Sequence, residues 1–109
     1  MGRNLHELAK ARSLALHHAV AARLREQPAL LDAARARVEA WRRDGSVAPF
    51  YASAWADVLA GDLEAVAAAL VAPGERATAL RQVTPFAGVV DPRTRWRIWR
   101  QERDAFAGR

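Results

Sequence analysis

The chain contains no cysteine, which excludes disulfide bonds and thiolate ligands for a metal. This absence is typical of proteins kept in a reducing compartment. The chain also lacks an apolar run long enough for a signal peptide or a membrane-spanning helix. We therefore expect a cytoplasmic protein that does not associate with a membrane.

Groups suited to catalysis are scarce as well. The sequence has three histidines, and two of them, His17 and His18, are adjacent, so that on a helix they would point about 100° apart. It shows no metal-ligand spacing, no glycine-rich phosphate loop and no nucleophile elbow. We expect a protein that is not an enzyme and has no metal or cofactor, with its histidines on the surface.

The residues that are abundant favour helices. Alanine makes up about a quarter of the 109 residues, leucine is common, and β-branched runs are absent apart from Val89-Val90. Apolar residues recur at helical spacing between Pro, Gly and Asp positions, which predicts an all-α fold: a small irregular bundle of five or six short helices in a single domain, residues 1–109. The expected helices cover residues 5–25, 28–43, 50–60, 63–71, 75–83 and 92–105.

Each expected helix has an apolar side that we assign to the core. In the first helix the apolar stripe also carries Arg12 and Arg23, which either cover the core edge with their methylene groups or meet another chain. In the third helix Phe50 falls on the packed side together with Trp55. The stripe of the first helix comprises Leu5, Leu8, Ala9, Ala15, Leu16, Ala19 and Val20, and that of the second comprises Leu30, Leu31, Ala34, Val38 and Trp41.

Arginine accounts for all but one of the 17 basic residues, which exceed the 12 acidic residues and give a net charge of +5. A guanidinium stacks on aromatic rings and pairs with carboxylate or phosphate through two parallel hydrogen bonds. The positive charge therefore permits a nucleic acid or an acidic protein as partner and does not choose between them.

Arginine and tryptophan are concentrated between residues 81 and 100. An irregular loop over residues 84–90 contains Phe86, which is either a plug for the core or an anchor for a partner. The following helix begins at Asp91-Pro92, where Asp is a favoured cap and Pro suits the first helical position. On that helix one stripe holds Trp96, Trp99 and Phe106, and a separate basic face holds Arg93, Arg97 and Arg100.

Two interpretations of this helix compete. In the first, the tryptophans seal the core and the arginines are merely solvated. In the second, the helix is a docking surface, because Trp and Arg are the residues that interface hot spots favour. We adopt the second; a membrane-surface helix is disfavoured because Asp91, Glu102 and Asp104 interrupt the basic character. The predicted partner-binding residues are Arg81, Gln82, Phe86, Arg93, Trp96, Arg97, Trp99 and Arg100.

The helices expected over residues 63–71 and 75–83 have the proportions of a helix-turn-helix, with Pro73-Gly74 between them. A simple turn within the bundle explains the same pattern. The helix over residues 75–83 also has only two basic residues, next to an acidic one. This is few for a DNA-binding helix, because phosphate contacts dominate the affinity for DNA. A DNA-binding transcriptional regulator is therefore the alternative function, and its base-reading residues would be Arg76, Thr78, Arg81 and Gln82.

Four segments carry a family resemblance: residues 12–17 (Arg-Ser-Leu-Ala-Leu-His), 36–41 (Ala-Arg-Val-Glu-Ala-Trp), 80–89 (Leu-Arg-Gln-Val-Thr-Pro-Phe-Ala-Gly-Val) and 95–96 (Arg-Trp). Together they resemble small all-helical antitoxins that are often encoded ahead of nucleotidyltransferase-like toxins of the MenT/AbiEii type. Such toxins transfer nucleotides to tRNA acceptor ends, and their active sites combine metal-binding carboxylates with basic residues.

The resemblance implies an antitoxin that binds its cognate toxin and blocks the nucleotide or tRNA site. An arginine-rich helix could then engage the carboxylates of the toxin directly. We therefore expect a nucleotidyltransferase-like toxin as the partner protein. Self-association, stoichiometry and DNA binding are left open by the sequence.

Overall fold

The computed structural model describes the backbone of residues 2–107 and the side chains of residues 5–107. Within this range the chain forms six α-helices and no strand, which confirms the predicted all-α fold and each of the six expected helices. The first helix begins earlier than expected, the fifth ends two residues sooner, and the sixth continues two residues further. The helices are α1 (Gly2–Glu26), α2 (Ala29–Asp44), α3 (Pro49–Leu59), α4 (Leu63–Leu70), α5 (Glu75–Arg81) and α6 (Pro92–Ala107).

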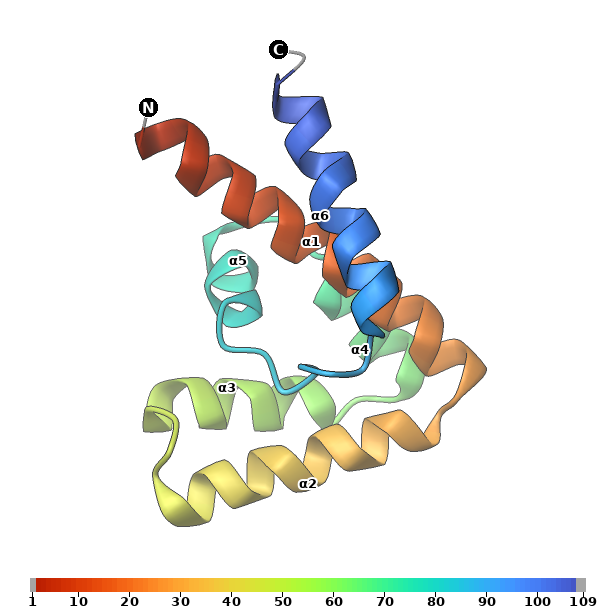
Figure 1. The fold of residues 1–109 in the computed structure, drawn as a ribbon. Helices are drawn as coiled ribbons and strands as arrows, with labels where there is room; N and C mark the ends of the chain where they lie inside the picture. The colour runs from red at the N-terminus through yellow and green to blue at the C-terminus, as the bar shows by residue number, and fades with distance from the viewer. Residues whose placement is uncertain (1, 108–109) are drawn as a thin grey trace.

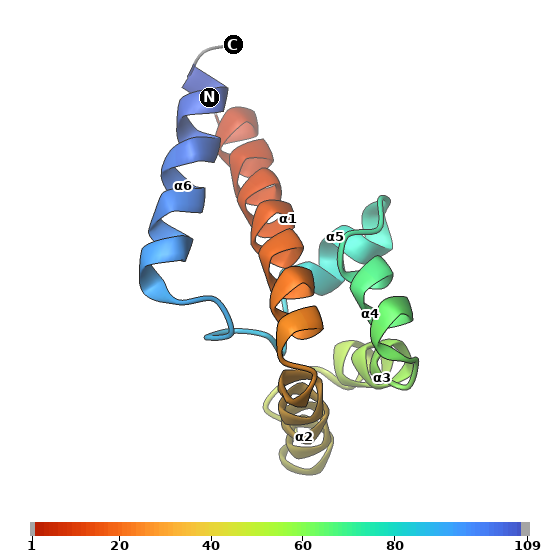
Figure 2. The same cartoon turned by 90° about the vertical axis from the view of Figure 1, so that its right-hand side faces the viewer.

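The long helix α1 is the centre of the arrangement. Helices α4 and α5 pack on one side of α1, and α6 packs on the other side, antiparallel to α1 (Figure 2). Helices α2 and α3 form a hairpin across the end of α1 that is remote from the two termini (Figure 1). The first residues of α1 and the last turns of α6 therefore project from the rest of the bundle.

The helix ends follow the signals read from the sequence. The Asp62 carboxylate accepts the backbone N–H of Ala65 at 2.9 Å, which caps α4. At the start of α6 the Asp91 carboxylate accepts both the backbone N–H and the hydroxyl of Thr94, each at 2.9 Å. These hydrogen bonds to the charged form lower the pKa of Asp91. Gly45 ends α2 with φ of 69°, the left-handed conformation that glycine adopts without steric cost.

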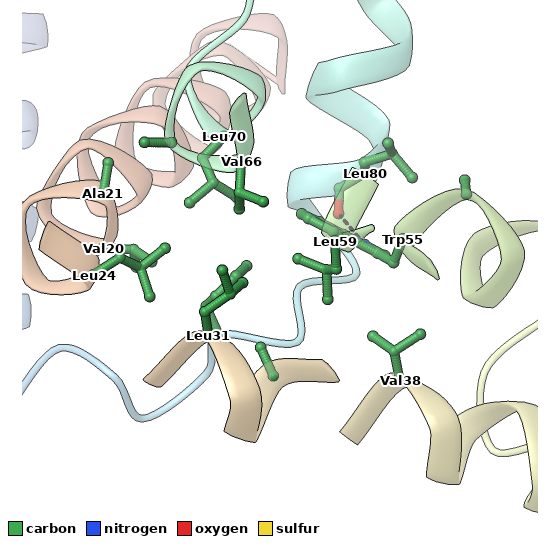
Figure 3. Packing of buried hydrophobic residues seen from close by; sticks show 14 of the residues in the cluster. Val20, Ala21, Leu24, Leu31, Val38, Trp55, Leu59, Val66, Leu70 and Leu80 are labelled. Carbon is green, nitrogen blue, oxygen red and sulfur yellow. Dashed lines mark hydrogen bonds between the residues drawn. The ribbon is translucent and has the colours of Figure 1, made fainter. Parts of the chain in front are cut away.

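One cluster of buried apolar side chains unites α1 to α5 and the loop after α5 (Figure 3). Trp55 is the largest fully buried side chain among the described residues, and its indole N–H donates to the carbonyl of Leu80 at 3.2 Å. Its ring meets the ring of Phe86 edge to face, with centroids 6.0 Å apart. Helix α6 contributes no residue to this cluster, so it is attached to a bundle that already has its own core.

Three expected core positions are wrong. Leu5, Ala9 and Phe50 are exposed, whereas the buried positions among the described side chains of α1 are His17, Val20, Ala21 and Leu24. Leu5 lies in the projecting part of α1, and Phe50 lies in the first turn of α3, where its ring contacts Tyr51. A helical stripe shows which side is apolar, but burial also needs a neighbouring element opposite that side.

The expectation that all three histidines lie on the surface is also wrong, because His17 is buried. Its Nδ1 lies 2.7 Å from the carbonyl oxygen of Ser13, which only accepts, so Nδ1 carries the proton. Its Nε2 then accepts the hydroxyl of Thr84 at 2.9 Å, and the same hydroxyl oxygen accepts the N–H of Phe86 at 3.1 Å. His17 therefore fastens the loop before α6 to α1.

His17 predicts a loss of stability in acid. Burial is the main cause that lowers the pKa of His17 below its ordinary value of 6.5. As the pH falls, His17 therefore binds a proton in the unfolded chain before it does so in the folded chain. The contribution of His17 to the free energy of unfolding is complete above pH 6.5 and is lost as the pH falls from 6.5 through the lowered pKa. Urea unfolding between pH 7 and pH 5 should show this loss in the native sequence. It should shrink in His17→Gln and persist in His18→Gln, and an equal loss in all three proteins would contradict the assignment.

Candidate functional site

Helix α6 presents most of its surface to solvent. It packs against α1, and its one buried residue is Ile98. In Figure 2 the side of α6 that faces away from α1 has no other helix beside it. The residues on that side are therefore available for contact with another molecule.

Four residues of α6 form a continuous exposed surface, which we call the Arg/Trp surface: Arg93, Trp96, Arg97 and Arg100. The Trp96 side chain is 57% exposed, an unusual position for the largest apolar side chain. Together with Gln101 and Asp104, the Arg/Trp surface lines a hollow of about 400 Å³.

Within the part of the chain that the structure describes, the three guanidinium groups of the Arg/Trp surface have no internal partner. Among the described residues, no carboxylate or carbonyl oxygen lies within hydrogen-bond or ion-pair distance of Arg93, Arg97 or Arg100. Arg103, by contrast, pairs with Asp104 at 3.7 Å. The sequence placed Trp96 apart from the basic face, but the structure brings it together with the three arginines around one hollow.

Trp99 has a different environment from Trp96. The guanidinium of Arg12 on α1 lies over the Trp99 ring, 4.4 Å from its centroid, and donates to the Trp99 carbonyl at 3.5 Å. This cation–π contact leaves the Trp99 side chain 44% exposed. Trp99 and Arg12 therefore join α6 to α1, so Arg12 has an internal role and Trp99 borders the Arg/Trp surface.

Two predicted partner-binding residues are buried, and their assignment to a surface is wrong. Phe86 is 2% exposed and packs against Trp55, so it fills the core and is not an anchor for a partner. Arg81 is 7% exposed, and its Nη1 donates to the carbonyls of Leu70 at 3.3 Å and Ala72 at 2.9 Å. Arg81 therefore binds the carboxyl end of α4.

Gln82 is exposed, as predicted, but it lies away from the Arg/Trp surface. It lines a groove of about 500 Å³ between α1 and α5, together with His6 and Lys10. Because α5 and α6 lie on opposite sides of α1, one small partner surface would not contact both Gln82 and the Arg/Trp surface (Figure 2).

The geometry also bears on the helix-turn-helix interpretation. Thr78 donates its hydroxyl to the carbonyl of Gly74 at 2.8 Å and accepts from Arg81 at 3.3 Å. Two of the four expected base readers, Thr78 and Arg81, thus form hydrogen bonds within the protein, and Arg76 and Gln82 remain exposed. Such a surface offers little for the recognition of a DNA sequence.

The described residues contain no group of three or more His, Asp or Glu side chains arranged to hold a metal ion. None of the six helices, over the range that the structure describes, is long and apolar enough to cross a membrane. Comparisons of the chain with models of protein families, with curated proteins and with solved structures found no match.

Proposed function

We propose that this protein is an antitoxin-like binding module that neutralises a nucleotidyltransferase-type toxin by docking the Arg/Trp surface over the toxin's active site. The observation that carries the proposal is the set of three guanidinium groups around the exposed Trp96 that have no partner among the described residues. The family resemblance of the sequence supplies the kind of partner.

The chemistry of the two surfaces would be complementary. An active site that holds metal ions presents carboxylates, and a guanidinium pairs with a carboxylate through two parallel, charge-assisted hydrogen bonds. Three such groups on successive turns of α6 would match a cluster of acidic residues. Trp96 would supply the buried aromatic anchor, since burial of an indole removes a large apolar area from water.

The docking proposal is tested by co-expression with the product of the adjacent gene. We expect the native chain to restore growth and to co-purify with that protein. Trp96→Ala is expected to weaken the complex about 30-fold, the equivalent of about 2 kcal/mol for a hot-spot residue. Replacement of Arg93, Arg97 and Arg100 together by alanine is expected to abolish growth rescue.

The matched control is Arg43→Ala, which removes an exposed arginine from α2. Its affinity for the partner should equal that of the native chain. A protein that neither rescues growth nor co-purifies with the adjacent gene product, or an Arg43→Ala variant that binds as weakly as Trp96→Ala, would contradict the proposal.

DNA binding is the second candidate, and the observation in its favour is the exposure of Arg76 on α5 and of Gln82 directly after it. A gel shift on the promoter of its own gene would decide, with salt titration to measure phosphate contacts. For a DNA-binding protein, Arg76→Ala and Gln82→Ala should abolish the shift, and the variants of the Arg/Trp surface should retain it.

A further inference from the structure

A second site lies on the side of the molecule remote from α6. A pocket of about 250 Å³ opens between α3, the end of α4 and α5. Its walls are mostly apolar and include Trp55, Val58, Ala77 and Leu80. The two charged residues that line it, Arg76 and Arg81, are both cations, and none of its lining residues is acidic.

Arg81 places an incompletely paired positive charge in the wall of this pocket. Of the five N–H donors of its guanidinium, Nη1 uses two on carbonyls and Nη2 uses one on Thr78. Its Nε is buried without a hydrogen-bond partner, and no carboxylate of the described chain forms an ion pair with Arg81. The end of α4 compensates this charge only in part, because a helix C-terminus carries about half a negative charge.

Arg76 supplies a second cation at the same pocket. It is exposed, and among the described residues it has neither an ion pair nor a side-chain hydrogen bond. An anion in the pocket would therefore pair directly with Arg76. It would also gain attraction from Arg81 across a wall of low polarity, where charges interact more strongly than in water.

We propose that this pocket binds a small carboxylate with an apolar body, about the size of benzoate. The carboxylate would lie toward Arg76 and Arg81, and the apolar body would lie against Val58, Ala69 and Ala77, beside the buried Trp55. The volume of about 250 Å³ is slightly below the range for drug-sized ligands, which fits a ligand of this size. The site does not depend on the docking function proposed for α6.

The test is an NMR titration of the folded protein with benzoate at constant ionic strength. We expect a saturable shift of the Trp55 indole N–H and the Ala77 amide. Benzamide, which lacks the charge, and acetate, which lacks the apolar body, should each bind at least about tenfold more weakly. Arg76→Gln should weaken benzoate about fivefold or more, and Arg43→Gln should leave its affinity unchanged.

Three results would overturn the proposal. The first is the absence of saturation with benzoate, and the second is equal binding of benzamide. The third is a set of shifts confined to the Trp96 and Trp99 indoles, which would place benzoate on the Arg/Trp surface. Because Arg76 is exposed, its replacement should leave the remaining spectrum intact, and this distinguishes lost binding from lost folding.

Discussion

Phe86→Ala is expected to lower the free energy of unfolding by about 3–5 kcal/mol, the range for truncation of a buried aromatic side chain. Phe86 is 2% exposed, and its ring fills the space beside Trp55 in the centre of the core. Removal of the ring would leave a cavity and an unsupported Trp55. It would also loosen the loop before α6, because the Phe86 ring is the part of this loop that packs against Trp55.

Urea unfolding monitored by circular dichroism measures this effect, and the midpoint of thermal unfolding should fall by at least about 10 °C. The matched control is Trp96→Ala, which removes a larger side chain from an exposed position and should change stability by no more than about 0.5 kcal/mol. A Phe86→Ala variant as stable as the native chain would contradict the role of Phe86 in the core. A Trp96→Ala variant as destabilised as Phe86→Ala would mean that Trp96 is not free for a partner.

The helices were predictable because their limits depend on residues close together in the chain. Asp62 and Asp91 each cap the following helix by accepting the backbone N–H of the residue three positions later. Gly45 ends α2 through its own backbone conformation. Such local signals need no knowledge of the tertiary structure. The boundaries that differed, at the end of α5 and at both ends of the chain, lack a comparable signal.

Burial was harder to predict because it depends on segments far apart in the sequence. His17 is buried by its contact with Thr84, 67 positions later, and nothing in the local pattern of α1 distinguishes it from the exposed His18. Leu5 lies on an apolar stripe, yet the projecting part of α1 leaves it uncovered. The periodicity of a helix shows its apolar side, and only the packing shows which part of that side is covered.

The candidate site was only partly predictable, because it also depends on contacts between segments far apart in the sequence. Arg93, Arg97 and Arg100 of the Arg/Trp surface could be placed on one side of α6 from their spacing. The difference between Trp96 and Trp99 could not, because it arises from Arg12 on α1, 87 positions from Trp99. Arg81 was assigned to a surface because arginine is rarely buried, and its partners at the end of α4 become visible only in the folded chain.

Arg81→Met is expected to destabilise the protein by about 2–4 kcal/mol. Methionine fills a similar volume but donates no hydrogen bonds, so the carbonyls of Leu70 and Ala72 would lose their donor within a buried region. A hydrogen bond from a charged group contributes about 1.5–3 kcal/mol, and an unsatisfied buried carbonyl costs about 1–3 kcal/mol. The cost of burying the charged guanidinium opposes this stabilisation. The same burial lowers the pKa of Arg81.

The balance is expected to favour the native arginine because one of its acceptors, the Leu70 carbonyl, belongs to the last residue of α4, where the helix dipole attracts a cation. Arg76→Met is the matched control, since Arg76 lies on the same helix but is exposed, and its effect should stay within about 0.5 kcal/mol. Urea unfolding of both variants measures the difference. A stability of Arg81→Met equal to that of the native chain would mean that burial of the charge costs as much as its hydrogen bonds contribute. In that case α4 and α5 would be joined by apolar packing alone.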